Sequence, residues 1–343
     1  MSALPSVSVV ICNYNYGHFV ADAINSAMTQ RQSAKEIVVV DDGSTDNSLE
    51  VIASFGEQVK VIAKANGGQM SAYNAGFEQI TGDVVIFLDS DDRLLPDVVG
   101  EVSQAMKAVD VARVHFKLEL IDHTGNKQGG VIPTLLAEGD LAPSVRKGQL
   151  FLAAPGSGNA YRVSALAEIM PLPSTPQEKH GADFFAGYAS AFLGKVVAIA
   201  RPLGQYRVHE AIEAQSIRFG NAKLGRRGAQ MIQGRYSHMR QWLARIRPQE
   251  KLAEQAIVDF SIQKQDFALS IFGPDHYLDG LKAGLIELPA VLRSIVLRDA
   301  SLIMKFGLGG WAIFVLIAPR AWGRPVARYV CNPSSRGLAQ SSS

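Results

Sequence analysis

The sequence predicts an α/β fold, a mainly parallel sheet flanked by helices, with a helical extension at the C-terminal end. Three observations support this fold. Short β-branched runs alternate with helical patterns through the first 110 residues, which is typical of a sheet covered by helices. The run at 84–88 is apolar throughout, as expected for a strand buried on both faces. After His209 the strand patterns stop and helical periodicity continues.

Each expected strand of the first half is followed by a polar turn and then by a helical pattern. We expect four strands, at 7–11, 36–40, 59–63 and 84–88. The helices between and after them are expected at 18–29, from about 46 to 55, at 71–80 and at 97–109. Ser44 or Asp46 can cap the second helix, because each places a short acceptor before an apolar-periodic segment.

The second half is less regular. An alternating strand is expected at 113–121, followed by a Gly- and Pro-rich excursion over 122–150. Further expected elements are a turn within 151–162, a helix at 164–170, a break at 171–176, a helix after Asp183 and a strand at 196–199. Helical patterns then cover 218–247, 250–272 and 281–297, the last interrupted near Pro289.

Composition limits the class of protein. The chain has 343 residues, of which 47% are hydrophobic, enough for a sizeable core. Its two cysteines offer no disulfide framework or zinc spacing, which fits a reducing cytosol, and no secretory signal is visible. Residues 1–110 hold 15 Asp and Glu against 6 Lys and Arg, whereas residues 281–343 hold 2 against 8. The acidic half is expected to hold a cation and the basic end to face something anionic.

Asp89, Asp91 and Asp92 crowd together directly after the buried strand at 84–88. Open α/β sheets bind ligands at the carboxyl ends of their strands, and clustered carboxylates suit Mg²⁺ or Mn²⁺. A nucleotide diphosphate could complete the metal shell; the alternative is a solvated acidic turn. Tyr14 and Asp42 follow neighbouring strands at the same edge, although Asp42 could simply shape a turn and Tyr14 could pack in the core. No P-loop or dinucleotide-binding glycine pattern occurs, which disfavours a P-loop ATPase and a standard dehydrogenase.

Four segments in this order and spacing resemble the inverting glycosyltransferases of family 2, which have the GT-A fold: S-V-V-I-C-N-Y-N, I-V-V-V-D-D-G-S-T-D, N-G-G-Q-M-S-A-Y-N-A-G and F-L-D-S-D-D-R-L-L-P-D. The resemblance implies a nucleotide-binding set of Cys12, Tyr14, Asp42, Asn66 and Ser90. It assigns the metal to Asp89 and Asp91, with Asp91 as the direct ligand. Tyr73 replaces an arginine that many relatives have, so a base or phosphate contact from that position is not carried over.

Three later segments carry the rest of the resemblance. Ser157, Gly158 and Asn159 occupy a loop that many relatives place near the donor sugar, although a plain turn explains the pattern equally well. Asp183 matches the general base of the family, and its neighbouring aromatic residues could desolvate it; a helix cap is the ordinary alternative. Arg207 and His209 lie in a Y-R-x-H segment that returns to the active site. There Arg207 would be a structural, phosphate or acceptor-side contact, and His209 a third metal ligand.

The resemblance implies a single in-line displacement, in which Asp183 deprotonates the acceptor hydroxyl and the anomeric configuration inverts. We expect a nucleotide-sugar half at 1–110, an acceptor half at 111–215, a helical region at 216–330 and a disordered tail at 331–343. Two alternatives are a nucleotidyltransferase, which should carry a Gly-rich basic loop after its first strand, and a non-catalytic homologue. The presence of all four aspartates, Asp42, Asp89, Asp91 and Asp183, disfavours the second.

The apolar run at 306–319 has 14 residues, fewer than the ~20 needed to span a bilayer, and is flanked by arginines and tryptophans. We expect it to lie in an anionic membrane surface; a buried helix is the alternative. This predicts a peripheral protein at the cytoplasmic face of the inner membrane, acting on a glycan or lipid-linked acceptor in envelope polysaccharide synthesis and not on nucleic acid.

Overall fold

The structure is a computed structural model that describes residues 3–176, 178–209, 228–298 and 300–331. They form two compact units, one of residues 1–147, 151–208 and 238–253, the other of 148–150, 209–237 and 254–343. The expected boundary between 215 and 216 lies outside the described residues. So does the expected tail, except for Cys331, which ends a helix.

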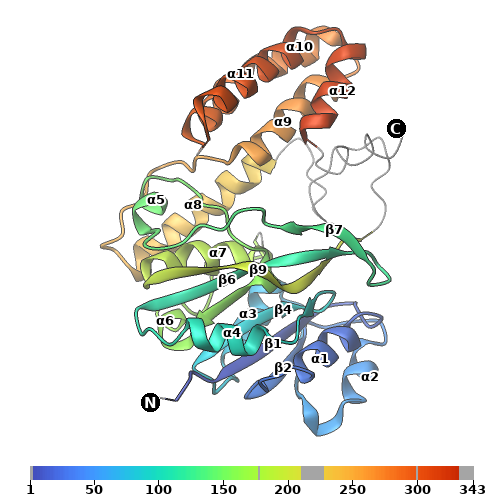
Figure 1. The fold of residues 1–343 in the computed structure, drawn as a ribbon, viewed down its shortest axis with the longest axis vertical. Coiled ribbons are helices and arrows are strands. Elements are labelled where there is room, and N and C mark those ends of the chain that lie inside the picture. The colour runs from blue at the N-terminus through green and yellow to red at the C-terminus, as the bar shows by residue number, and fades with distance from the viewer. Residues whose placement is uncertain (1–2, 177, 210–227, 299, 332–343) are drawn as a thin grey trace. The chain divides into compact units, whose positions relative to one another are not determined.

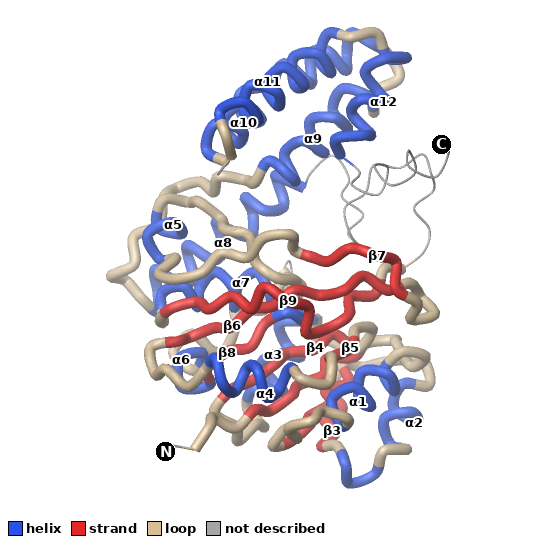
Figure 2. Tube along the Cα trace, viewed as in Figure 1, coloured by secondary structure: helices blue, strands red, loops and turns tan. Residues whose placement is uncertain are grey.

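The first unit is built on four parallel strands in the order β3-β2-β1-β4 (Figures 1 and 2). They are β1 (Val7–Asn13), β2 (Glu36–Asp41), β3 (Lys60–Ala63) and β4 (Val84–Asp89). All four strands predicted from the first half of the sequence are confirmed. Because they are parallel, their carboxyl ends meet at one edge of the sheet.

Alternate side chains of these strands face opposite layers of helices. Val9, Val39 and Ile86 belong to a core shared with α1 (Val20–Met28), α2 (Ser48–Ala53) and α4 (Val98–Ala105). On the other face Gly76 of α3 (Gln69–Phe77) lies so close to Val10 that an added Cβ would clash with its methyl group. The apolar strand pattern is thus explained by burial on both faces.

The rest of the sheet is antiparallel or mixed. The short strand β8 (Asn159–Arg162) inserts between β4 and β6 (Val111–Ile121), antiparallel to both. β9 (Lys195–Arg207) then runs parallel to β6 and antiparallel to β5 (Arg93–Leu94), and β7 (Lys127–Ile132) pairs with β6. The sheet is therefore mixed, and less parallel than the sequence predicted, because residues 159–162 looked like part of a turn.

Short helices complete this unit. They are α5 (Ala142–Arg146), α6 (Val163–Leu166) and α7 (Ala182–Ala189), with 3₁₀ turns η1 (Gly56–Gln58), η2 (Gly156–Gly158) and η3 (Ser190–Phe192). The segment at 122–150 contains β7 and α5 and is more regular than the predicted excursion.

The second unit is helical. α8 (Gly228–Ile246) has its first half in this unit, and α9 (Phe260–Phe272), α10 (Tyr277–Leu297), α11 (Leu302–Ile317) and α12 (Arg320–Cys331) follow. They enclose a separate core that includes Phe267 and Trp311. α10 continues through Pro289, which is exposed, so water can reach the backbone carbonyl that the missing N–H leaves unbonded. Within the described residues, no helix is both long and apolar enough to cross a bilayer.

His115 on β6 makes the first unit sensitive to acid. Its Nε2 donates to the Ala137 carbonyl oxygen at 2.7 Å, and its ring is fully buried. Burial, followed by the nearby Arg113, lowers the pKa of His115 to about 3. The unfolded chain, with an ordinary histidine pKa of about 6.5, therefore binds a proton that the folded protein excludes, so stability falls as the pH drops from 6.5 towards 3.

We expect His115 to cost about 2 kcal/mol of unfolding free energy between pH 7 and pH 5. Urea unfolding of wild type and of His115→Gln at both pH values measures this. The variant should lose less stability on acidification, whereas His276→Gln, at an exposed histidine, should behave as wild type. An equal pH dependence in all three proteins would contradict the assignment.

Candidate active site

Polar side chains gather where β1, β2 and β4 end. Asn13 Nδ2 donates to Asp41 Oδ2 at 2.8 Å, which ties the ends of β1 and β2 together. Cys12, half-buried between them, has its thiol pKa raised by burial and then by the charges of Asp89 and Asp42. Both carboxylates therefore lie within electrostatic reach of its sulfur. The convergence expected from strand order is present in the fold.

Tyr14 and Asp42, two of the predicted nucleotide contacts, differ in exposure. Tyr14 is 46% exposed directly after β1, so its ring is open to a ligand. Asp42 is nearly buried and accepts hydrogen bonds from Lys64 Nζ at 2.6 Å and from the backbone N–H groups of Gly67 and Gly68. Asp42 thereby shapes the loop that holds Asn66, which is exposed, whereas the predicted contact Ser90 is buried.

The three aspartates that follow β4 have different surroundings. Asp92 is buried, accepting a bond from Ser157 Oγ at 2.6 Å and one from the Arg207 backbone N–H at 2.9 Å, so it stabilises the turn. Burial, then Asp91, then Asp183, raise the pKa of Asp89 to about 7. Asp91 is partly exposed. Asp89 and Asp91 are thus the two of the three that are partly exposed, and their predicted metal contact remains a prediction.

This pair fits a divalent cation. The two carboxylates present hard oxygen ligands, and bound Mg²⁺ or Mn²⁺ would offset the charge of Asp91 that raises the pKa of Asp89. Across the residues that the structure describes, no three His, Cys, Asp or Glu side chains are arranged to hold an ion. A metal here would therefore depend on further oxygens from the bound donor. His209 belongs to the second unit, and its metal contact remains a prediction.

Asp183 lies in the first turn of α7, after Gly181, whose φ of +81° lets the chain turn into the helix. Its Oδ1 accepts a bond from the Phe184 N–H at 2.8 Å, and the buried Phe184 and Phe185 fix the helix to the core. The charge of Asp183 helps to raise the pKa values of Asp89 and of the buried Tyr73. The predicted base is therefore within electrostatic reach of the predicted metal-binding pair.

Gln69, at the start of α3, joins these two groups and was not predicted. Its Oε1 accepts from the backbone N–H groups of Gly181 and Ala182, each at 3.1 Å, so its Nε2 must be the atom facing Asp89 Oδ1, at 3.4 Å. Beside it, Gly68 has a φ of +84° and lies so near Lys179 that a Cβ would come within 2.6 Å of the Lys179 carbonyl oxygen. In the sequence, the only indication of this close packing beside Gln69 is the adjacent glycine pair, Gly67 and Gly68.

We expect Gln69→Glu to separate the two contacts of this side chain. The glutamate can still accept from α7, but it places an oxygen where Asp89 meets an amide N–H. Loss of such a supporting contact typically lowers activity ~10- to 100-fold. Steady-state kinetics should show a fall in kcat, with an unchanged thermal midpoint; Gln69→Met, which loses both contacts, should be less stable as well. Full activity of the glutamate variant would limit Gln69 to holding α7.

The loop of Ser157, Gly158 and Asn159 is buried, which corrects the prediction of direct sugar contacts. Ser157 Oγ accepts from the Asp89 N–H at 3.1 Å while it donates to Asp92, and Asn159 Nδ2 donates to the carbonyl oxygens of Ala154 and Pro155. Ser157 thus holds the acidic turn, and Asn159 holds the loop that carries Ser157.

Gly156, the residue before this loop, lies against the Asp89 side chain. A Cβ there would be 3.1 Å from Asp89 Oδ2 and from Tyr73 Oη. Tyr73 stacks on Phe87, with ring centroids 4.0 Å apart, and its buried hydroxyl has no hydrogen-bond partner among the residues that the structure describes. Tyr73 therefore contributes packing and one hydroxyl group where many relatives have an arginine.

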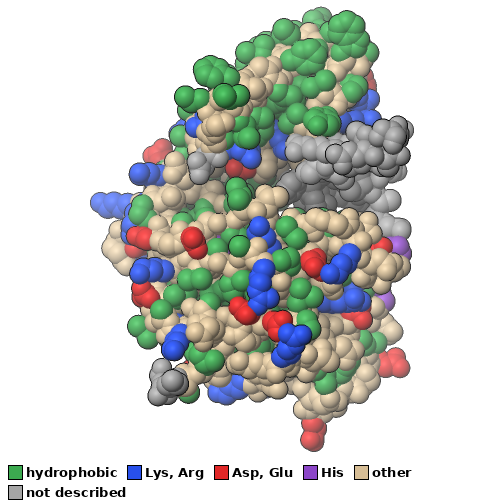
Figure 3. Space-filling view, in the orientation of Figure 1, with side chains coloured by type: hydrophobic (Ala, Val, Ile, Leu, Met, Phe, Trp, Pro, Cys, Tyr) green, Lys and Arg blue, Asp and Glu red, His purple; other side chains and the backbone are tan. Residues whose placement is uncertain are grey.

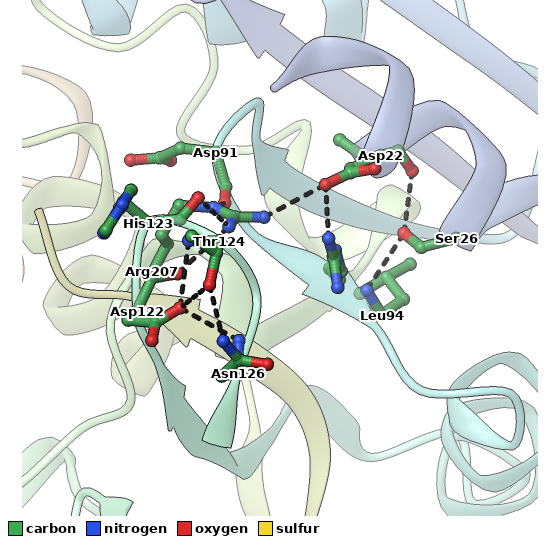
Figure 4. A network of polar contacts seen from close by, with 11 residues as sticks. Asp22, Ser26, Asp91, Leu94, Asp122, His123, Thr124, Asn126 and Arg207 are labelled. Carbon is green, nitrogen blue, oxygen red and sulfur yellow. Dashed lines mark hydrogen bonds and ion pairs between the residues drawn. The ribbon is translucent and has the colours of Figure 1, made fainter. Parts of the chain in front are cut away.

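Arg207, predicted as an acceptor-side or phosphate contact, is also turned inward (Figure 4). Its Nε donates to the Asp91 carbonyl oxygen at 2.7 Å, and its Nη1 donates to the carbonyl oxygens of Asp122 and His123 at 3.1 and 2.9 Å. Its Nη2 pairs with Asp22 of α1 at 3.2 Å. Arg207 thus holds Asp91 by its backbone, and the predicted direct contact is replaced by a positioning role.

Three comparisons place this site among known proteins. Residues 8–169 match the family described as glycosyl transferase family 2. An uncharacterized glycosyltransferase of Nostoc is 38% identical over 211 residues, covering 60% of this chain and 65% of that protein. The uncharacterized glycosyltransferase YibD of Escherichia coli is 38% identical over 99 residues, covering 28% and 29%. The chain thus matches less than two thirds of the length of either relative.

A solved structure of TarS from S. aureus, residues 1–349 in complex with UDP-GlcNAc, superposes with a TM-score of 0.53. The alignment covers 97% of this chain and 92% of that one at 16% identity. At this identity the likeness concerns the fold, which confirms the expected architecture.

Proposed function

Because residues 8–169 of this chain form a family 2 glycosyltransferase domain with the GT-A fold, we propose that it is an inverting, metal-dependent hexosyltransferase-like enzyme. It transfers a sugar from a nucleotide-diphosphate sugar to a hydroxyl of a glycan or lipid-linked acceptor. The observation that carries the proposal is the convergence of three carboxylates from two segments: Asp91 and, from α7, Asp183 both lie close enough to Asp89 at the end of β4 to raise its pKa.

The donor would lie across the ends of β1, β2 and β4. Tyr14, exposed after β1, offers a flat face for the base; Asp42 follows β2 and bonds to the loop after β3 that holds Asn66. Cys12 and Ser90 line the floor between them, where the Ser90 N–H donates to the Cys12 carbonyl oxygen. The UDP-GlcNAc bound by TarS is a donor of this class.

Asp183 would accept the proton of the acceptor hydroxyl as its oxygen attacks the anomeric carbon, and the configuration inverts because there is one displacement. Asp89 and Asp91 would hold Mn²⁺ or Mg²⁺, which when bound offsets the negative charge of the departing diphosphate. Gln69 orients Asp89 relative to α7, and Arg207 with Ser157 fixes the turn that carries Asp91.

A thermal-shift screen tests this function. The full chain is heated with UDP-, GDP- and dTDP-sugars, with and without Mn²⁺ or Mg²⁺. A ligand at 100 times its Kd adds about 2.7 kcal/mol of stability, so one nucleotide class should raise the melting temperature, and only with the metal. A chain that no nucleotide sugar stabilises under any metal condition would refute the proposal.

For the acceptor, we propose a lipid-linked glycan in the synthesis of a bacterial exopolysaccharide, O-antigen or similar envelope polymer. The enzyme would then work as a peripheral protein at the cytoplasmic face of the inner membrane. The basic, apolar helices of the second unit support this proposal.

A further inference from the structure

α11 is apolar on all sides, and Lys305 is the only charged residue among its 16. One face, which includes Trp311, Val315 and Leu316, packs in the core of the second unit. The opposite face carries Ile303, Phe306, Ile313 and Ile317, which are exposed; Ile303 is 86% exposed and Phe306 78%. A helix that is hydrophobic all round normally has an apolar partner on every side, whereas among the described residues this face of α11 is left exposed.

The neighbouring helices extend the exposed face. On α10, Ile286 and Val296 are exposed. On α12, Trp322 and Tyr329 are exposed, and because they are seven residues apart they lie on the same face, two turns from each other. Figure 3 shows hydrophobic side chains gathered over α10 and α11. We call the exposed apolar residues of these three helices the outer surface of α10–α12. Exposed apolar side chains gathered in this way mark an interaction site.

Basic residues outnumber acidic ones on these helices, which carry Lys282, Arg293, Lys305, Arg320, Arg324 and Arg328 against Asp279 and Glu287. Arg293 on α10 and Arg324 on α12 are exposed, and Lys305 lies within α11. Residues 281–343 as a whole hold 8 Lys and Arg against 2 Asp and Glu. Two copies of the chain that met through this surface would bring these like charges together. An anionic partner would instead complement them, while tryptophan and tyrosine suit a boundary between apolar and polar layers.

We propose that the outer surface of α10–α12 docks on the face of an anionic lipid bilayer. α11 is about 24 Å long, shorter than the ~30 Å hydrocarbon layer, so it would lie in the interface and not cross it. The sequence predicted a single interfacial helix; the structure offers three helices that form one rigid surface around a common core. The inference deepens the proposed function, since it places the second unit where a lipid-linked acceptor is found.

Vesicle flotation of the full chain tests the docking without any donor or acceptor. Wild type should float with vesicles of phosphatidylcholine and phosphatidylglycerol, and less so at high salt or with phosphatidylcholine alone. Ile303→Glu with Phe306→Glu should lower vesicle binding at least ~100-fold, because the bilayer would no longer bury the two apolar side chains. Val109→Glu with Leu135→Glu is the matched control: it adds the same charge at two exposed apolar residues of the first unit and should float as wild type.

A second variant tests the charges. Arg293→Gln with Arg324→Gln removes two exposed arginines without touching the apolar residues. Each of the two substitutions should weaken vesicle binding about fivefold, which corresponds to ~1 kcal/mol for a basic residue near an anionic surface. The weakening should disappear at high salt.

Three outcomes would overturn the docking. Wild type would fail to float, or the α11 variant would float as well as its control. The third is that wild type is a dimer without lipid and the α11 variant is a monomer. This result would assign the surface to a second copy of the chain. The thermal-shift screen is independent of all three, so a failure of the docking can be told from a failure of the proposed chemistry.

Discussion

Asp183→Asn should lower the rate of sugar transfer by ~10²- to 10⁴-fold, the usual cost of losing a general base. Asparagine keeps the shape of the side chain at the start of α7 but cannot take the proton of the acceptor hydroxyl. Affinity for the donor should be unchanged, because the residues proposed to bind the donor lie at the ends of the parallel strands and not on α7. Single-turnover transfer, together with donor binding by calorimetry, separates the two effects.

The matched control is Asp97→Asn. Asp97 also precedes a helix, α4, and pairs with Arg31 at the surface at 2.6 Å, outside the group of carboxylates at the strand ends. It should retain wild-type transfer. Near-normal turnover of Asp183→Asn would mean that another group deprotonates the acceptor.

Asp91→Asn should remove the metal dependence of donor binding and slow transfer by at least ~10²-fold, since metal stabilisation of a leaving group contributes several kcal/mol. The fold should be intact, because asparagine keeps the size of the side chain and the bond from Arg207 to the backbone carbonyl oxygen of residue 91 is unchanged. Titration of the donor nucleotide with and without Mn²⁺, beside a thermal melt, measures both.

Asp83→Asn serves as the control for this change, since Asp83 lies at the opposite end of β4, where it accepts bonds from Ser6. It should cost some stability and leave the metal response unchanged. The assignment of Asp91 is rejected if donor binding by Asp91→Asn still strengthens with Mn²⁺ as in wild type.

The sequence was sufficient for the parallel strands and for the edge at which their polar residues meet. Both depend on local patterns: a β-branched run predicts a buried strand, and the residues after it must lie at its carboxyl end. The pattern could not reveal β8, because a four-residue strand directly after Pro155, Gly156 and Gly158 looks like part of a turn. Nor could it reveal the continuity of α10 through Pro289, which depends on that residue being exposed to water.

Polar residues near the site were harder to interpret. Ser157, Asn159 and Arg207 are the residue types that contact sugars and phosphates, yet the Ser157 hydroxyl, the Asn159 Nδ2 and the Arg207 guanidinium bond to other parts of the protein. A sequence does not state whether a polar atom binds a ligand or a distant part of its own chain. Gln69 was missed for the same reason, since its partners at 181 and 182 are more than 100 positions away.

The turn after β4 also depends on the order in which the chain is made. Asp92 accepts its backbone bond from Arg207, which is 115 residues further along. At a synthesis rate of about 5–20 residues per second, Arg207 leaves the ribosome ~6–23 s after Asp92. Until then the nascent chain can pair its four parallel strands, but it lacks the residue that closes its acidic turn. The acidic turn is thus completed when β9 joins the sheet. A chain cut before residue 207 would contain Asp91 and Asp92 but lack the hydrogen bonds from Arg207 that fix them.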